Sequence, residues 1–369
     1  MLRKEFIQIF RDPRMRTIIF VVPLVQMFVF AYAATTDVVN IPMAVYDLDG
    51  TPASRELVSK FEGTGLFRIA ARIADENQAE KLLDHGAVSI VLHIAHGYGA
   101  ALKAGKAPQV QVLVDGTDSN TGGVVLQYGS RIITEYSRDL LESAMKTRYG
   151  AAAAAPGVTL ETRSWFNENL HSRWHFLPGL MMILVTLISL LLTGMAVVRE
   201  KEIGTIEQII VTPITRLEFI LGKTLPFAII GYADMAIVVA VATGWFRLPV
   251  RGNLLLIVLA VACYLLCTLS IGLYISTISE TQQQALMSTF LFMFPAVLLS
   301  GFMFPIANMP EPVQWLTAVN PMRYFLLIIR TVFLKGVGLD VLWPQYASLF
   351  ALGIAIASFA ISRFRKSMN

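Results

Sequence analysis

Long apolar segments constrain this chain more than any other feature of its sequence. Each has about 20 residues, which is the length of a helix that crosses the hydrocarbon core of a bilayer. The segments are residues 17–34, 175–198, 221–245, 254–277, 285–304 and 342–361. The whole chain is 55% hydrophobic with a mean hydropathy of +0.60, well above an ordinary soluble domain. The sequence therefore predicts an α-helical polytopic membrane protein with six transmembrane helices.

The segment 35–173, between the first and second apolar segments, has a different character. It is rich in charged residues and has no run long enough to span a membrane. Patterns typical of strands alternate in it with patterns typical of helices. The predicted strands are 41–46, 67–71, 88–94 and 110–114, and the predicted helices are 52–61, 76–83, 98–104 and 121–146. We therefore expect an inserted α/β domain with its own core.

A charged loop, residues 199–216, joins the second and third apolar segments. Thr205 with Gln208, and Thr215 with Glu218, have the spacing of capping boxes, so one helix should begin at each threonine. Pro213 should end the first of these helices. Three isoleucines give that helix one apolar face: Ile206, Ile209 and Ile210. The pattern predicts a short amphipathic helix between two membrane spans.

The order and spacing of residues in and after this loop resemble the signature loop of the ABC type-2 exporter permeases. The matching residues are Arg199, Glu200, Lys201, Glu202, Gly204, Thr205, Glu207, Thr212, Pro213, Glu218, Gly222, Lys223 and Pro226. The resemblance implies that the loop is a coupling helix that docks on a separate ATPase subunit. It assigns ATPase coupling to Glu200, Glu202, Gly204, Thr205, Glu207, Ile209, Thr212 and Pro213. The alternative is a charged loop that only sets membrane topology.

Basic residues indicate how the spans are oriented. They cluster in residues 1–16, in the 199–216 loop and after residue 361, and this places both termini in the cytoplasm. Residues 1–16 should form an amphipathic interfacial helix, with 17–34 as an uncleaved first span; a signal peptide is the alternative. With this topology the 35–173 domain is extracytoplasmic, and 174–369 holds the other spans. Ser279 with Gln282 is a further capping box, which predicts where the fifth span begins.

The segment 305–343, between the fifth and sixth spans, is rich in proline. Residues 313–318 and 324–333 are apolar but too short to cross, which predicts interfacial or re-entrant helices on the outer side. Pro321 after Asn320 is typical of a helix start. Asn320, Pro321 and Tyr324 again resemble the family, in which such helices lie above the translocation path. An ordinary outer loop is the alternative.

Polar side chains inside the predicted spans are the candidates for a path or a switch. Asp234 is costly in the third span unless it faces a cavity or a partner. It is either a substrate, proton or switch contact, or a structural acid hydrogen-bonded to Tyr232 or to a neighbouring Thr or Ser. Thr186, Ser189 and Thr193 form one polar stripe on the second span. Such stripes more often join helices than bind cargo, and this one could do both.

Two short motifs are similar to sequence motifs of catalytic or nucleotide-binding sites. The sequence from Asp47 to Thr51 has the aspartate spacing of haloacid-dehalogenase-type phosphatases, whose chemistry also needs a lysine and a distal acidic pair that holds magnesium. The only loose candidates for that pair are Asp115 and Asp118, which lie in a turn of glycine, serine and asparagine. We instead expect a turn in which Thr51 caps the helix that begins at Pro52. Lys223, in a Gly-Lys-Thr triplet, lacks the upstream glycine of a phosphate loop. No metal site is predicted, and ATP and magnesium should bind to a partner ATPase.

Two functions from different classes remain open. The first is a permease subunit of an ATP-binding-cassette exporter in a bacterial inner membrane, moving an amphiphilic drug or lipid. It implies an ABC ATPase subunit, a dimer with an identical or related permease, membrane lipids and, for the outer domain, a periplasmic adaptor; the net charge of +4 gives no reason to expect nucleic acid. The second is a membrane receptor or scaffold whose outer domain binds a ligand.

Overall fold

The computed structural model describes residues 6–7, 10–33, 40–117, 119–149, 165–167, 171–204 and 216–367. The chain divides into two compact units. Unit 1 comprises Met1–Thr35 with Arg163–Asn369, and unit 2 comprises Thr36–Thr162. Residues 1–5 and 8–9 of the predicted amphipathic helix, and the loop positions 205–215, lie outside the described residues.

Unit 2 is built on a four-stranded sheet in the order β2-β1-β3-β4. The strands are β1 (Ile41–Asp47), β2 (Phe67–Ile73), β3 (Ile90–Ile94) and β4 (Val110–Val114). β1 pairs in parallel with β2 and β3, whereas β4 runs antiparallel to β3. The helices are α4 (Pro52–Gly63), α5 (Glu76–Asp84), α6 (Tyr98–Lys103) and α7 (Ser119–Tyr149). These are the strands and helices that the sequence pattern predicted, within two residues at most ends; the location of the unit outside the cytoplasm stays a prediction.

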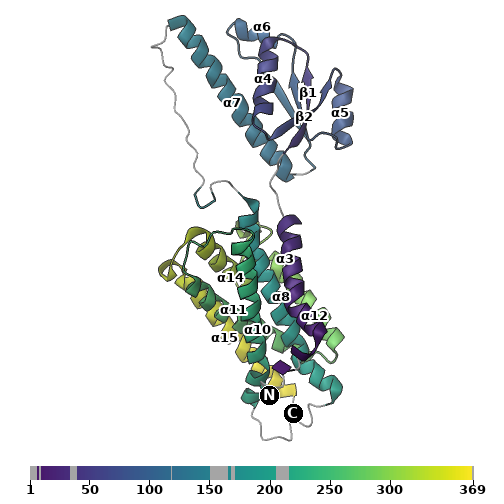
Figure 1. The fold of residues 1–369 in the computed structure, drawn as a ribbon, viewed down its shortest axis with the longest axis vertical. Coiled ribbons are helices and arrows are strands. Elements are labelled where there is room, and N and C mark those ends of the chain that lie inside the picture. Colours follow the sequence, from purple (N-terminus) through teal and green to yellow (C-terminus); the bar gives the residue numbers. More distant parts are fainter. Residues whose placement is uncertain are drawn as a thin grey trace. The chain divides into compact units, whose positions relative to one another are not determined.

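Helices cover both faces of this sheet (Figure 1). On one face, α4 and α7 bury a core with Met43, Phe61 and Leu92 at its centre, each of them fully inaccessible. On the other face, α5 packs over Ala44 and Val91. Successive residues of a strand point to opposite faces of the sheet. Because helices cover both faces, neighbouring residues of the same strand are apolar. Unit 2 therefore has a core of its own.

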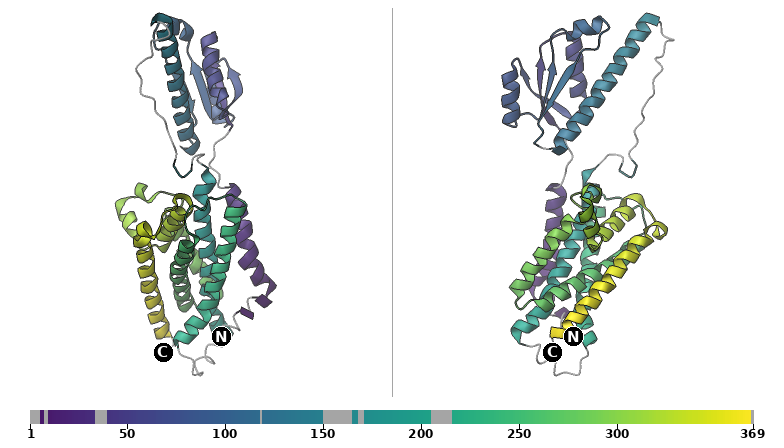
Figure 2. Two further views of the ribbon diagram at one scale, coloured as in Figure 1. Left: turned by 60° about the vertical axis from the view of Figure 1, so that its left-hand side comes forward. Right: turned by 180° about the vertical axis from the view of Figure 1, so that it is seen from behind.

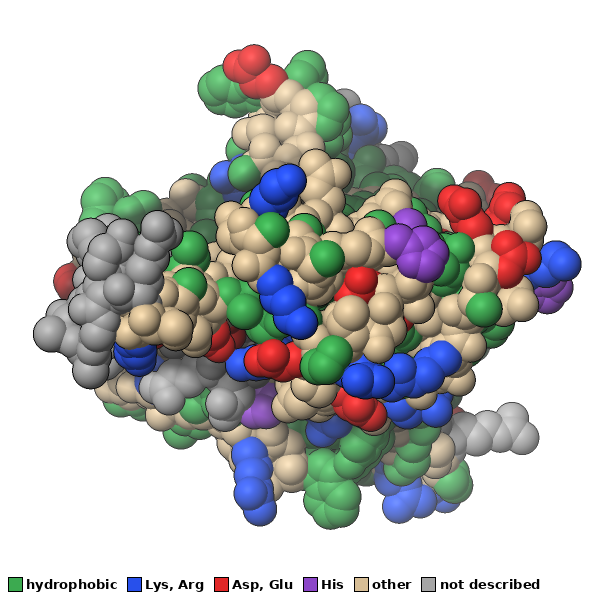
Figure 3. All heavy atoms as spheres, turned by 90° about the horizontal axis from the view of Figure 1, so that it is seen from above, with side chains coloured by type: hydrophobic (Ala, Val, Ile, Leu, Met, Phe, Trp, Pro, Cys, Tyr) green, Lys and Arg blue, Asp and Glu red, His purple; other side chains and the backbone are tan. Residues whose placement is uncertain are grey.

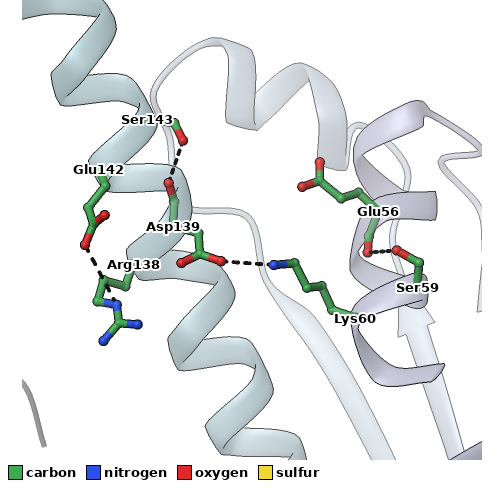
Figure 4. A network of polar contacts seen from close by, with 7 residues as sticks. All are labelled: Glu56, Ser59, Lys60, Arg138, Asp139, Glu142 and Ser143. Atoms are coloured by element: carbon green, nitrogen blue, oxygen red, sulfur yellow. Dashed lines mark hydrogen bonds and ion pairs between the residues drawn. The ribbon is translucent and has the colours of Figure 1, made fainter. Parts of the chain in front are cut away.

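Exposed ion pairs lie on the helices of unit 2. In the view of Figure 3, basic and acidic side chains likewise lie intermixed. The close-up in Figure 4 shows that Lys60 of α4 contacts Asp139 of α7 at 3.0 Å, and that Arg138 and Glu142 pair along α7 at 3.9 Å. These side chains are about half exposed, so solvent screens each pair and the pairs contribute little to stability. The apolar core, and not these pairs, holds α4 against α7.

Unit 1 is a bundle of helices, shown from three sides in Figures 1 and 2. Four of the described helices are long and apolar enough to cross a membrane. They are α8 (Ser172–Ile203), α10 (Arg216–Gly244), α11 (Leu254–Ile278) and α15 (Leu339–Ser367). The predicted first and fifth spans are shorter helices: α2 (Pro13–Arg16), η1 (Thr17–Val21) and α3 (Val22–Ala33) follow one another, and α12 is Gln282–Leu298. The count of six spans stays a prediction.

Helix α8 is the centre of the bundle. Its most apolar stretch is 78% buried, against 22–56% for the other three long helices. It packs against α3, α10, α11, α12 and α14 (Pro321–Arg330). Glycines permit the closest approach: a Cβ on Gly272 of α11 would lie 2.7 Å from Cβ of Thr193 on α8. Any displacement of α8 must therefore displace its neighbours.

The segment predicted as interfacial or re-entrant contains η2 (Ile306–Asn308), α13 (Glu311–Thr317), α14 and η3 (Thr331–Lys335). α14 packs against α8, α11 and α15. Its Phe325 is fully buried and stacks on Tyr264 of α11, with ring centroids 3.9 Å apart and planes 6° apart. The short helix is thus part of the bundle core, which an ordinary surface loop would not be.

One predicted helix start is wrong. The side chain that caps α12 is that of Thr281, which accepts a hydrogen bond from the Gln284 N–H at 3.1 Å. Ser279 instead ends α11, and its hydroxyl donates to the Ile275 carbonyl at 2.8 Å. Both residues have capping chemistry, and the turn is too short for spacing alone to choose between them.

Candidate functional site

The end of α8 that precedes the signature loop carries a buried ion pair. Lys223 Nζ of α10 lies 3.0 Å from Glu200 Oε1 of α8, and the two side chains are only 4% and 8% exposed. The same amine donates to the Ala196 carbonyl, also at 3.0 Å. Buried charges are retained only when they are paired and hydrogen-bonded, as these are. The pair therefore joins the helix that enters the loop to the helix that leaves it.

The next two residues of α8 bind the ends of α11 and α12. Lys201 Nζ donates to the carbonyls of Thr277 and Ser279 at 2.7 and 3.2 Å, at the end of α11. Glu202 accepts from the Gln282 N–H at 2.7 Å and from the side-chain amide of Gln282, at the start of α12. A cation at a helix C-terminus and an anion at a helix N-terminus both match the helix dipoles. Two adjacent residues of opposite charge thus hold two adjacent helix ends.

A serine of α11 adds a further link. Ser276 is fully buried, and its Oγ accepts hydrogen bonds from the backbone N–H groups of Val197 and Val198 at 3.0 and 3.1 Å. We call the set of Val197, Val198, Glu200, Lys201 and Glu202 with Lys223, Ser276 and Gln282 the α8 junction. It connects four helices, α8, α10, α11 and α12, over the last two turns of α8.

The junction lies directly beside the loop that the sequence singles out. α8 ends at Gly204, whose φ of 76° is the left-handed conformation that suits glycine at a helix C-terminus. Of the predicted coupling residues, Glu200, Glu202 and Gly204 are described, and the first two lie in the junction. Thr205, Glu207, Ile209, Thr212 and Pro213 lie outside the described residues. A force applied to the loop would reach four helices through the junction.

The sequence did not predict the contacts of three side chains of the junction. Lys201 and Lys223 match the family's signature loop, but the resemblance assigns ATPase coupling to neither, and no partner is predicted for them. Ser276 lies inside an apolar span and has no role in that pattern. The charge pattern did contain a signal: a basic residue one turn into the third span is as costly as Asp234, so it required an acidic partner.

The predicted outer residues form a second cluster of contacts. Asn320 caps α14 by accepting from the Met322 N–H at 3.1 Å, and its side-chain amide donates to the Ala296 carbonyl of α12 at 2.6 Å. Pro321 is the first residue of α14, as predicted. The Tyr324 hydroxyl donates to the Ala318 carbonyl at 2.9 Å. These contacts fix α14 to the end of α12; a role in a translocation path stays a prediction.

Asp234 lies about three turns beyond Lys223 on α10 and is 1% exposed. Its Oδ2 has no hydrogen-bond partner among the described residues. Tyr232, the expected partner, instead donates to the Val258 carbonyl of α11 at 3.1 Å. Asp234 is packed with the apolar side of α10 that includes Ile230 and Val238. Such a carboxyl oxygen costs about 1–3 kcal/mol in this arrangement of the helices.

The polar stripe on α8 is buried and locally satisfied. The hydroxyls of Thr186, Ser189 and Thr193 each donate to the carbonyl four residues earlier, at 2.5, 2.6 and 2.7 Å. Thr186 also hydrogen-bonds to the hydroxyl of Tyr264 on α11. Among the described residues, Thr186 is the one hydroxyl of the three that bonds to another helix, so the stripe is joined to α11 at that point; contact of the stripe with cargo stays a prediction.

The carboxylates of the phosphatase-like motif accept hydrogen bonds from groups in and near the same loop. Asp47 accepts from the N–H groups of Asp49 and Gly50, both at 3.0 Å, and from the Ser54 hydroxyl at 2.7 Å. Asp49 accepts from the Thr51 hydroxyl and, at 2.9 Å, from the Gly99 N–H. These bonds, led by that from Thr51, hold the pKa of Asp49 below its ordinary value. Thr51 caps α4 as predicted.

The motif also lies where doubly wound sheets bind ligands. In such sheets the crevice beside the carboxyl ends of the strands, where the strand order reverses, takes the ligand. In unit 2 that place is between β1 and β3, and there Asp49 accepts the hydrogen bond from the Gly99 N–H. Among the described residues, no group of acidic, histidine or cysteine side chains could hold a metal ion. The arrangement is that of a structural turn.

Comparison with known proteins gives consistent matches over the whole chain. Residues 14–362 match the family described as ABC-2 family transporter protein. The chain is 30% identical to the probable multidrug ABC transporter permease YbhR of Escherichia coli over 368 residues, covering 100% of this chain and 98% of the relative. It is also 30% identical to the inner membrane transport permease YhhJ of the same organism over 370 residues, covering 99% and 96%. A more distant relative is the linearmycin resistance permease protein LnrN of Bacillus subtilis, at 21% identity over 90% of each chain.

Proposed function

Because the chain belongs to the ABC-2 transporter family, we propose that it is the membrane subunit of an ATP-driven exporter in a bacterial inner membrane. The relatives named above are permeases, two of them from Escherichia coli. The chain itself matches no phosphate-loop pattern, so the ATPase is a separate subunit that binds ATP and magnesium. Two copies of this chain, or this chain and a related permease, pair with two ATPase chains. Both termini and the signature loop lie in the cytoplasm.

One observation carries this proposal: the α8 junction lies beside the signature loop and links four helices. A force on the loop can move the membrane spans only if the loop is rigidly connected to them. The Lys223–Glu200 pair supplies one between α8 and α10. Lys201 and Glu202 extend the connection to α11 and α12. Closure of the ATPases would thus act on four spans together.

The cargo in this proposal is an amphiphile, either a drug or a lipid. The described spans are apolar over most of their length, and the relatives named as multidrug permeases agree with this class of cargo. Asp234 and the Thr186, Ser189 and Thr193 stripe are the polar groups available for contact with cargo or for a switch. Asn320, Pro321 and Tyr324 position the short helix at the far end of the path. Unit 2 lies outside the cytoplasm, where a periplasmic adaptor could dock.

The test is co-purification of the tagged chain with its ATPase partner. Wild type is compared with a Glu207→Arg, Thr212→Arg double variant in the loop and with a matched Glu142→Arg variant in unit 2. Glu142 is about half exposed and, among the described residues, pairs with Arg138 along α7, so its reversal controls for a change of surface charge. We expect the ATPase to bind wild type and the Glu142 variant, and to be lost from or uncoupled in the loop variant.

The opposite result would replace the proposal. If no ATPase associates with a folded chain under any of these conditions, a receptor or scaffold function takes its place. If the ATPase binds the loop variant as well as wild type and ATP hydrolysis remains coupled, the loop is not the docking element. The chain would then be a family member that couples to its ATPase through some other surface.

A further inference from the structure

The end of unit 1 remote from the α8 junction carries a group of basic side chains. They come from the first turn of α8, the turn after α10, and the end of α14 with η3. We call them the basic collar: Arg173, His175, Arg247, Arg251, Arg330 and Lys335. None of them lies within 4.0 Å of a carboxylate among the described residues. This charge is unusual for the predicted outer end, because basic residues near spans favour the cytoplasmic side.

Several contacts connect the collar's members. Arg251 donates its backbone N–H to the Phe333 carbonyl of η3 at 3.1 Å, and the glycine after Lys335 packs against the Arg251 backbone. The charged ends of Arg251 and Lys335 both lie 6.0 Å from the ring of Phe166. Two cations thus share one aromatic ring, and each such contact is worth about 0.5–1 kcal/mol at an exposed site.

Arg330 and His175 of the collar contact each other. Arg330 Nη2 lies 3.2 Å from His175 Nε2, and Arg330 Nη1 lies 3.4 Å from the Gly301 carbonyl. Since a guanidinium can only donate, the histidine nitrogen must accept, and the ring is therefore neutral in this contact. The guanidinium keeps its full charge. Its Nε is buried and has no acceptor among the described residues.

This arrangement has the chemistry of an oxyanion site. The Nε and Nη2 edge of a guanidinium forms two parallel hydrogen bonds with a phosphate or carboxylate. Arg330 is partly buried, so its charge is screened less than that of a surface arginine. His175 beside it is exposed, so the pair borders the protein surface, whereas Arg330 Nε is covered in this arrangement and is reached only if the Arg330 or His175 side chain turns. An anion seated there would satisfy the Nε donor and offset the collar's charge.

We propose that the Arg330–His175 pair binds the phosphate of an anionic phospholipid headgroup, and that the other basic residues of the collar attract this headgroup electrostatically. The aromatic surroundings favour a lipid as the source. Trp245, two residues before Arg247, and Trp343, in the second turn of α15, are 65% and 62% exposed, and Trp245 donates to the Tyr32 hydroxyl at 3.1 Å. Exposed tryptophan and tyrosine are typical of the headgroup level of a membrane.

The experiment is native mass spectrometry of the full-length chain, purified in detergent with equal amounts of phosphatidylglycerol and phosphatidylcholine. The quantity measured is the ratio of the two lipids that the protein retains. We expect wild type to prefer phosphatidylglycerol and Arg330→Gln to lower that preference about tenfold, as expected for loss of a charged hydrogen bond. Arg330→Lys keeps the charge without the paired donors, and it should retain part of the preference.

The matched control is Arg323→Gln, which removes the same charge from the same helix. Arg323 donates to the Thr317 hydroxyl and lies outside the collar. An equal loss in both variants would mean diffuse attraction and would overturn the proposal, as would a wild type without preference. Inorganic phosphate is added in a separate arm: if it binds and the lipid does not, the lipid assignment is wrong. Should Arg330→Gln fail to fold, a lysine variant identical to wild type would also contradict the proposed fork.

Discussion

Replacing Lys223 by methionine tests the α8 junction most directly. The amine is 3.0 Å from Glu200 Oε1, where two unit charges attract by about 5.5 kcal/mol at an effective dielectric constant of about 20. Much of that attraction only offsets the cost of burying both charges. Removal of one partner, in contrast, leaves the other charge buried without its counter-ion, which typically costs about 3–5 kcal/mol. A loss of this size lowers a thermal midpoint by on the order of 10 °C.

The assay is thermal unfolding of the purified chain in one detergent, followed by circular dichroism, because all five tryptophans lie in unit 1 and their fluorescence would not report on the control in unit 2. Lys223→Met should melt on the order of 10 °C below wild type, and adding Glu200→Leu should recover most of the loss, because no charge is then left unpaired. Lys60→Met is the control: its pair with Asp139 has the same 3.0 Å distance but is about half exposed, so the change should be small. A single variant as stable as wild type, or a double variant no better than the single, would refute the reasoning.

Four further outcomes follow from individual contacts. Asn320→Ala removes the cap of α14 and its bond to the end of α12, and should cost about 1–3 kcal/mol in the same unfolding assay. Gly272→Ala places a Cβ 2.7 Å from Thr193, so α8 and α11 must separate and the midpoint should fall by an amount corresponding to about 1–3 kcal/mol. Asp49 has a pKa below its ordinary value of 3.8, so it stabilises unit 2 above that pH and loses this contribution as the pH falls through the folded pKa; Asp49→Asn should flatten this acid loss in circular dichroism. Asp234→Leu should leave the melting point equal or higher, because it removes a buried oxygen without a partner, while transport falls; a lower melting point would show that the carboxyl has a partner.

Local patterns predicted unit 2 well, because its elements are specified by nearby residues. The Thr51 cap, the apolar strand residues and the glycine-rich turns act over a few positions, and the structure places strands and helices where those signals lie. The same holds for the start of α14 at Asn320 and Pro321. Where two capping residues compete over a short turn, as Ser279 and Thr281 do, local spacing no longer decides.

The junction could be predicted only in part, since its contacts join residues far apart in the chain. Glu200 stands out by its place in the signature loop, but its partner Lys223 follows 23 residues later. Ser276 contacts the α8 backbone 78 and 79 residues away in sequence. No periodicity encodes such pairings; they result from the packing of α8 against α10 and α11. The physical rule that a buried charge needs a partner would have limited the candidates for the partner of Lys223 to acidic residues.

Helix α10 combines two buried ionisable groups in opposite situations. Near its start, Lys223 is paired and fixed to α8. About three turns on, Asp234 has a carboxyl oxygen without a partner among the described residues. A ligand or an ATPase can shift a two-state equilibrium only through contacts that differ between the states. The junction is already satisfied in this arrangement of the helices and has little to gain from a change, whereas Asp234 would gain from any arrangement that brings it a donor. We therefore expect the junction to move as one body during transport, and the neighbours of Asp234 to be the contacts that change.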